Sequence, residues 1–380
     1  MFRAYDAYSK YAQNSNEKSA GVAPDNIVSQ AQPGIQTLYR APDFSASDGS
    51  GIASVLQQLS PASWGAILAS SLHREQQITD IVSEFHSPGT RTAGEDAWRS
   101  FAIPFGGSVR QQQQNDRAGY RSDSYGMVVG AEKQHGDNNW TFGFHSAISG
   151  QSVTVKSPYS GTGKTKTFNV GLHARYGFPQ QEGGYLSASL RAGLEDGQLT
   201  RHIRVEDYTA SNRSNWTGIT TSAYAGGGYN YSLSEKNTLG PVAGLNYTRL
   251  HRPHVTENGK GGSSLDIDSA TFNSLRSSIG LKNNGSHSLP SGAILSTELQ
   301  FTWDHELLET SQLQTANFVG YSRAAFIHRN QIAGRNALNA KAGLRYQINQ
   351  NVELGAGVSS ELLRSGYDSL SGNLSVNWRF

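Results

Sequence analysis

Cysteine and long hydrophobic runs are both missing from this 380-residue sequence. The lack of cysteine suits a chain that crosses an oxidising compartment, although it does not identify one by itself. No run approaches the ~18 apolar residues of a transmembrane helix, which excludes that class of membrane protein. The formal charge of +2 gives no reason to expect a nucleic-acid partner. Because the first residues lack the apolar core of a secretory signal, we expect this chain to be the C-terminal part of a longer protein.

The most informative feature that is present is a strict alternation of polar and apolar residues at the C-terminus. The apolar positions of the last strand are Leu374, Val376, Trp378 and Phe380. Successive side chains of a strand point to opposite faces, so this segment is predicted to have one apolar and one polar face. A final strand that ends in Phe is typical of the outer-membrane barrels of Gram-negative bacteria. There it is the signal read by the barrel-assembly machinery, and we assign that role to these four residues.

The same alternation recurs from residue 96 to the end of the chain. The clearest examples are 168–178, 186–195 and 338–348, each near the ~9–11 residues that a tilted strand needs to cross a bilayer. We predict an all-β fold, a 12-stranded antiparallel transmembrane β-barrel, because single-chain bacterial barrels have an even number of strands. The expected strands are 96–110, 119–136, 138–152, 164–178, 184–199, 214–233, 238–252, 266–283, 292–306, 334–348, 350–363 and 366–380.

The connections between these strands are predicted to alternate in length. Short turns are expected at 137–138, 180–183, 234–237 and 349–350, and long breaks at 153–163, 200–213, 253–265 and 307–333. Barrels have short periplasmic turns and longer external loops, so the long breaks should lie outside the cell. Aromatic residues near the strand ends fit the girdles at the two membrane surfaces: Tyr125, Trp140, Tyr176, Tyr185, Trp303, Tyr346 and Trp378.

The second face of the predicted strands contains charged residues. Charge is expensive in lipid, so this face should line a wet interior. The residues assigned to the lumen are Arg175, Arg191, Glu195, Glu298, Lys341, Arg345 and Glu353.

Residues 61–86 differ from the rest because their apolar residues recur near the helical period. Ser60 suits the N-cap, Pro61 the first helical position, and Pro88-Gly89 the end of the helix. About 25 helical residues span ~37 Å, enough to cross the membrane thickness. Its charged residues would forbid contact with lipid: Arg74, Glu75, Asp80 and Glu84. A barrel of twelve strands leaves room for roughly one helix, so we place this α-helix inside the pore; packing on a periplasmic face is the alternative.

No catalytic, cofactor or metal site is predicted. The segment 160–165 has Gly161, Gly163 and Lys164 but neither the complete phosphate-loop pattern nor its strand-to-helix setting. His173 is interpreted as a lumen residue, and the sequence 304–306 (Asp-His-Glu) as part of the barrel rim. No Gly-x-Ser-x-Gly elbow indicates an esterase. We therefore expect a protein that is not an enzyme.

The segment 59–64 (Leu-Ser-Pro-Ala-Ser-Trp), its helix, the twelve expected strands, the sequence 303–306 (Trp-Asp-His-Glu) and the final Phe380 together resemble the translocator domain of autotransporters, the type Va secreted proteins of Gram-negative bacteria. The resemblance covers about residues 50–380 and extends weakly to 10–50, where residues 14–18 look like a helical linker. It implies a passenger remnant or linker at 1–60, a pore-spanning helix at 61–88 and a barrel at 96–380. It also implies export of an N-terminal passenger, with the helix left as a plug.

The expected partners are outer-membrane lipid, the barrel-assembly machinery, periplasmic chaperones and the protein's own passenger, around a monomeric barrel. Some family members cleave the passenger between two asparagines of the pore helix; no Asn pair occurs at 61–86. The alternatives are a free-standing channel or adhesive barrel, the broken end of a larger gene, and a soluble β-sandwich.

Overall fold

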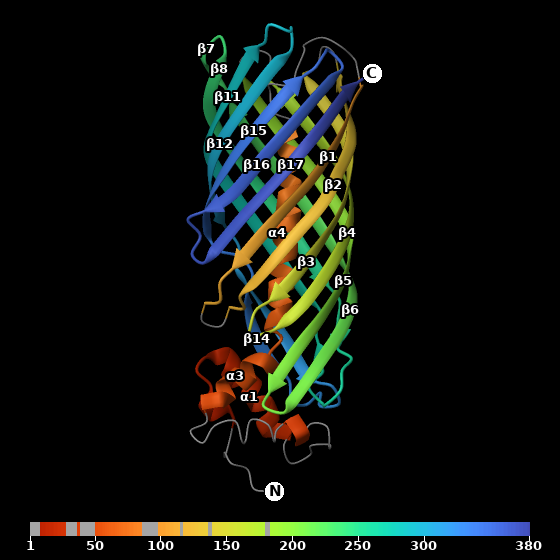
Figure 1. The fold of residues 1–380 in the computed structure, drawn as a ribbon, viewed down its shortest axis with the longest axis vertical. Helices are drawn as coiled ribbons and strands as arrows, with labels where there is room; N and C mark the ends of the chain where they lie inside the picture. Colours follow the sequence, from red (N-terminus) through yellow and green to blue (C-terminus); the bar gives the residue numbers. More distant parts are fainter. Residues whose placement is uncertain are drawn as a thin grey trace.

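The computed structural model describes residues 8–27, 36–38, 50–85, 98–114, 117–135, 139–178 and 183–380; the side chains of Glu84, Phe85 and His135 are not part of that description. Twelve long antiparallel strands close into a barrel (Figure 1). They are β1 (Trp98–Gln111), β2 (Tyr120–His135), β3 (Trp140–Val155), β4 (Gly161–Gly177), β5 (Gly184–Val205), β6 (Tyr208–Tyr229), β8 (Asn237–Arg252), β11 (Ala270–Ser288), β12 (Ile294–Glu306), β15 (Asn336–Gln347), β16 (Val352–Leu362) and β17 (Tyr367–Arg379). The predicted fold class is confirmed.

Closure depends on pairings between strands that do not follow each other directly in the chain. β17 pairs with β1 along most of its length, and β8 pairs with β11 after the intervening chain has left the barrel. The last residue is held as well, because the N–H of Phe380 donates to the carbonyl of Trp98 at 3.1 Å. The four apolar residues of the terminal strand are exposed on the outer surface, whereas Asn377 between them is buried on the inner side.

The alternation in the sequence corresponds to the two faces of the barrel wall. On β4 the side chains of Phe168, Val170 and Leu172 are each more than half exposed, while Asn169 and His173 are buried toward the interior. Apolar side chains of the other strands are exposed on the same outer surface. Such a surface is stable only against lipid, since a monomeric soluble protein rarely exposes a continuous apolar patch of this size. None of the described helices is both long and apolar enough to span a bilayer.

The two ends of the barrel differ. At the end where the chain terminates, the described connections are short: β7 (Tyr231–Ser234) and the turn to β8, the turn 289–293, and the turn 348–351. The expected turns at 137–138 and 180–183 lie mostly outside the described residues. We call this the C-terminal end and the opposite one the cap end.

At the cap end the prediction of a long break at 200–213 is wrong. β5 and β6 continue as a hairpin that turns at Glu206-Asp207, with Glu206 at φ 47°. The breaks at 253–265 and 307–333 are not irregular either. They contain β9 (Val255–Thr256), β10 (Leu265–Ile267), β13 (Ser311–Phe318) and β14 (Phe326–Gln331), which form a second sheet in the order β14-β13-β10-β9.

Three short helical elements lie beside this second sheet: η1 (Tyr8–Tyr11), α1 (Ser15–Ile27) and α3 (Ser50–Leu59). α1 packs on β14 of the sheet, and η1 and α3 pack on α1. We call these elements and the second sheet the cap; Figure 1 shows α1 and α3 at the end of the barrel opposite the C-terminus. α1 covers the free edge of β14. The amide N–H groups of Ile327 and Arg329 donate to Ser19 Oγ and Asn16 Oδ1, at 2.9 and 2.8 Å. A sheet edge that would otherwise attract another strand is thereby closed by a helix of the same chain.

The joint between α3 and the next helix rests on one buried side chain of β5. The guanidinium of Arg201 donates to both carboxylate oxygens of Glu257, at 2.7 and 2.8 Å. It also donates to the carbonyls of Gln58 and Ser60, at 3.0 and 3.3 Å, which are backbone acceptors at the end of α3. A buried pair with its remaining donors satisfied avoids the cost of an uncompensated charge, so Arg201 fixes where the chain enters the barrel.

The cap should lose stability as the pH falls, because His328 of β14 is buried and burial lowers its pKa from 6.5 to about 3. Its folded pKa lies below the unfolded one, so the unfolded cap binds the extra proton first and stability declines below pH 6.5. We expect a loss of about 2 kcal/mol at pH 5. Hydrogen-exchange protection factors of the β14 amides at pH 7 and pH 5 measure it. His328→Leu should remove the dependence, whereas exposed His287→Leu at the other end should retain it; equal protection at both pH values in the wild type would contradict the prediction.

Candidate functional site

The interior of the barrel is occupied by α4 (Ala62–Phe85). The helix runs along the barrel from the cap end to the C-terminal end, as Figure 1 shows. Ser60 Oγ accepts a hydrogen bond from the N–H of Ala62 at 3.4 Å, in the position predicted for the N-cap. Every side chain from Ala62 to Leu72 is buried, and polar and apolar residues alike face the wall. The helix has no lipid-facing or solvent-facing side over this stretch, as expected for a helix enclosed on all sides.

The first turn of α4 is held in a mostly aromatic neck. The ring of Trp64 lies 4.8 Å from that of Trp216 on β6, and the guanidinium of Arg252 lies 4.0 Å over the Trp64 ring. Gly65 is required by the close approach of β14, since a Cβ there would lie 2.3 Å from Asn330 Oδ1. The neck therefore joins the helix to the barrel wall and to the cap at the same level.

A buried ionic network holds the middle of the helix to β4 and β5. Arg74 donates to Glu195 at 2.6 Å and to Thr165 Oγ1 at 2.6 Å, and lies 3.3 Å from Glu75. Arg191 pairs with the other oxygen of Glu75 at 3.1 Å. Removing such charges from water costs several kcal/mol per ion, so the network adds little to the free energy of unfolding. Its main effect is to fix the position of the helix relative to the barrel wall. Only one rotation and one depth of the helix satisfy both carboxylates.

A second set of contacts holds the opposite side of the helix. Asp80 lies 3.5 Å from Arg276 of β11 and 3.5 Å from Lys341 of β15. Two turns earlier on the helix, His73 Nδ1 and the hydroxyl of Tyr367 on β17 are 3.0 Å apart. The helix is thus anchored to strands on opposite sides of the barrel. Small cavities of about 30 and 80 Å³ lie along the wall of β15 to β17 beside α4.

The residues assigned to the lumen from the sequence divide into two groups in the structure. Arg191, Glu195 and Lys341 reach the helix, as described above. The others contact the wall: Arg175 lies 4.8 Å over the ring of Tyr185, Glu298 pairs with Lys282 at 2.9 Å and Arg345 at 3.0 Å, and Glu353 accepts from Asn377 at 2.9 Å. Of the helix residues, Arg74, Glu75 and Asp80 make the contacts given above, and the side chain of Glu84 lies outside the described part.

The sequence analysis missed three side chains that hold the helix: Arg276, Arg201 and Tyr367. Arg276 was visible as an inward position of an expected strand, but its contact with Asp80 joins segments almost two hundred residues apart. Arg201 lies in the segment 200–213, for which the sequence predicts a loop.

His173 lies on the inner wall, with its Nδ1 3.1 Å from that of His145 and its Nε2 3.4 Å from Glu132. Asp304 and Glu306 face inward, whereas His305 bonds Asn336 on the other side, so these three do not converge. Within the described residues there is no cluster of three or more metal-ligating side chains.

A closed barrel of twelve strands with an apolar exterior, a polar interior and its own helix in the lumen is an outer-membrane protein of the translocator class. The chain belongs to the autotransporter beta-domain family, whose model matches residues 101–359. It therefore lies in the outer membrane of a Gram-negative bacterium. Because barrels have short periplasmic turns and longer external loops, we assign the cap end to the outside of the cell and the C-terminal end to the periplasm.

Individual relatives and solved structures agree with this assignment. An extracellular serine protease of Serratia marcescens is 25% identical over 344 residues, which are 85% of this chain and 30% of that protein. The translocator domain of NalP from Neisseria meningitidis is similar in fold, with a TM-score of 0.65, 17% identity, and coverage of 84% of this chain and all of that one. The beta domain of Bordetella BrkA has a TM-score of 0.54 at 21% identity, with coverage of 75% of this chain and all of that one. This chain spans less than a third of the length of the Serratia relative.

The ionic network predicts that Arg74→Met will loosen the helix within the barrel. The change leaves Glu195 buried without its ion-pair partner and Glu75 paired with Arg191 alone, and we expect a local loss of about 3–5 kcal/mol. Hydrogen-exchange protection of the α4 amides in the detergent-solubilised protein measures it. The double variant Arg74→Met/Glu195→Met should recover much of the protection.

A control pair lies on the outer wall, where Arg121 and Asp123 are both about half exposed. Arg121→Met should leave the α4 amides unaffected, because exposed pairs contribute little. If the α4 amides of the Arg74→Met variant were as well protected from hydrogen exchange as those of the wild type, the network would have no role in holding the helix.

Proposed function

We propose that this barrel exports a passenger attached N-terminal to it and that α4 stays in the pore afterwards as a plug. The observation that supports this most directly is the path of the chain. The cap lies at the external mouth, α4 passes inward through the lumen, and β1 begins at the periplasmic end. A segment that precedes the cap would then already be on the cell surface.

The contacts of α4 suit a segment that comes to rest after export. A passenger in transit needs a lumen that binds none of its side chains strongly. The wall around the helix is mostly polar, so it offers little apolar surface to which a passing segment would adhere. The resting helix instead matches this wall at Glu195, Arg191 and Arg276. Because these contacts need one register, they stop the chain at α4 and not at an earlier segment. The barrel catalyses no reaction in this scheme, and any enzymatic activity would belong to the passenger.

We also propose that the barrel-assembly machinery recognises β17 and that periplasmic chaperones deliver the unfolded chain to it. Before closure, β17 and β1 are the two free edges of the sheet, and the exposed apolar residues of β17 end at the periplasmic surface. A free strand edge next to aromatic side chains is a suitable template for pairing with another strand.

Replacing the last aromatic residue tests this recognition. Phe380→Ser should reduce the amount of barrel in the outer membrane several-fold, measured as the heat-modifiable band in membrane fractions. The matched control is Phe178→Ser, an exposed aromatic next to β4 that is not in the terminal strand. Equal assembly of Phe380→Ser and wild type would remove the proposed role of the terminal residue.

Deleting residues 61–86 tests the plug. With the helix gone, the lumen should conduct ions, and single-channel conductance in planar bilayers should rise well above that of the intact chain. A chain that lacks only residues 8–27 retains α4 and should stay as closed as the wild type. A free-standing channel predicts the opposite: the intact chain would conduct, and removal of the helix would change little.

A further inference from the structure

The outer wall on β2 to β6 has a sharp boundary between apolar and polar side chains. Ile148, Phe168, Leu194 and Ile219 are cross-strand partners, and each has half or more of its side chain exposed to the outside. The next outward row toward the external end is Gly150, Lys166, Asp196 and Thr217, followed by Ser152, Lys164, Gln198 and Asn215. The change from apolar to polar marks where the lipid chains of the outer leaflet end.

Two lysines of β4 lie directly at this boundary. Lys166 is the first outward residue of β4 beyond Phe168, and Lys164 is the second. Both are exposed, and neither makes a hydrogen bond or ion pair with the described residues. Asp196 lies across from Lys166, but its carboxylate accepts a hydrogen bond from Thr217 Oγ1 at 2.7 Å. The two ammonium groups are therefore available to a ligand.

The surface around the lysines is hollow. A concavity of about 780 Å³ is lined by Lys164, Lys166, Tyr125, Asp196, Gln198 and Asn215, together with six other residues. Its polar lining offers donors from three strands in addition to the two charges. Tyr125 closes one side, because its ring lies over Gly150, where a Cβ would come 2.9 Å from it.

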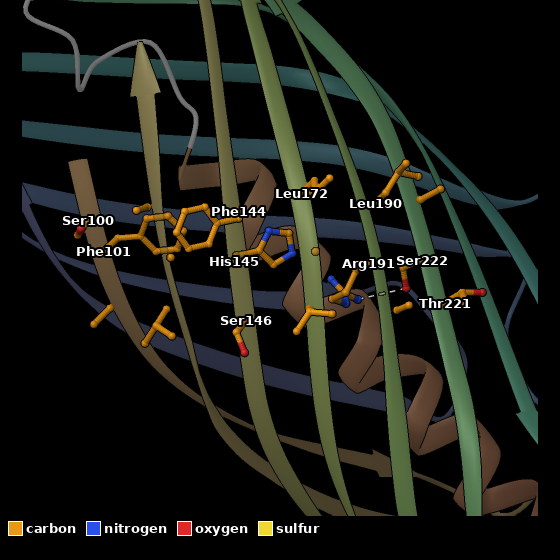
Figure 2. Close-up of a pocket in the computed structure, with 18 of the residues that line it drawn as sticks. Ser100, Phe101, Phe144, His145, Ser146, Leu172, Leu190, Arg191, Thr221 and Ser222 are labelled. Atoms are coloured by element: carbon orange, nitrogen blue, oxygen red, sulfur yellow. Dashed lines mark hydrogen bonds between the residues drawn. The ribbon is translucent and has the colours of Figure 1, made fainter. Parts of the chain in front are cut away.

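A second hollow continues toward the membrane centre on the same strands. It measures about 990 Å³, and small residues such as Ala131, Ala192 and Ala223 separate larger apolar ones. In Figure 2, Leu172 and Leu190 lie on the outer side of this region, and Arg191 lies on the side of α4. The two hollows are separated by the row that contains Phe168. We call the hollow around the lysines the upper hollow and the one nearer the membrane centre the lower hollow. Val170 lines the lower hollow and is four residues, or ~13 Å, from Lys166.

We propose that these two hollows form one binding site for a phosphorylated lipid of the outer leaflet. Lys164 and Lys166 would bind the phosphate, the amide side chains of Gln198 and Asn215 would donate to the sugar or glycerol oxygens, and an acyl chain would lie over the alanines below. Lysine binds phosphate as a point charge, and basic groups at a membrane surface attract anionic headgroups. The spacing between the hollows fits a headgroup followed by its own chain.

The experiment uses the full chain in neutral detergent, titrated with mixed micelles that contain a phosphorylated saccharolipid. Native mass spectrometry counts the lipid retained. The same lipid without its phosphates should bind weakly, and inorganic phosphate at equal phosphate concentration should not displace the intact lipid. Equal binding of the dephosphorylated lipid would overturn the proposal. Full displacement by inorganic phosphate would overturn the lipid as ligand and leave only an anion site.

Variants test the assigned residues, each after its heat-modifiable migration has shown a closed barrel. Lys164→Gln/Lys166→Gln should lower the affinity about 30-fold. The control Lys236→Gln/Lys260→Gln changes two other exposed lysines and should leave it unchanged. Asp196→Asn should raise the affinity, since it removes the one negative charge of the upper hollow and retains an acceptor for Thr217. Unchanged affinity in both the Lys164/Lys166 and the Asp196 variants would refute the assignment.

Discussion

The rest of this structure depends on one constraint: main-chain N–H and C=O groups at membrane depth have no water to bond and must find partners in the protein. A sheet meets this requirement only if it has no edge, and so the first and last strands must pair. The register between β1 and β17 achieves this and ties the final residue to Trp98. Once the sheet is closed, strict alternation gives every strand one side for lipid and one side for the interior. The polar interior is thus a consequence of closure as much as of the choice of residues.

A polar interior surrounded by lipid then sets what can fill it. An apolar helix would leave the charges of the wall without partners, and an uncharged polar one would leave them short of counter-charges. α4 supplies charges of both signs, and each of Arg74, Glu75 and Asp80 meets its opposite on the wall. The energetic gain of such buried pairs over an apolar equivalent is small. Their effect is selection of one depth and one rotation for the helix, which an apolar surface would not define.

The sequence predicted the membrane part of this protein well, because a bilayer imposes a single pattern on every strand. It failed at the external end for a physical reason visible on β5. Below the boundary the apolar residues are outward, as at Leu190 and Leu194; above it they are inward, as at Leu199 and Ile203. The strand continues, but the medium outside changes from lipid to water and the medium inside from polar lumen to the core of the cap. Because the apolar residues change from the outer to the inner face within one strand, the alternation is interrupted, and the sequence pattern predicts a loop there. The division into residues 1–60, 61–88 and 96–380 stays a prediction, although the described part of the first segment is largely helical and its helix α1 packs on the second sheet. The partners of the pore helix could be predicted by charge but not by pairing, since pairing requires the barrel register.

The cap has a mechanical consequence. Its core joins α1 and α3 to the second sheet and, through Arg201, to the point where the chain enters the lumen. This folded body is wider than a passage that a single helix fills, so the chain can move back into the periplasm only if the cap first unfolds. The folded cap therefore blocks the return of the chain through the pore. For the export proposed above, folding of the cap outside the cell would therefore give the movement of the chain its direction.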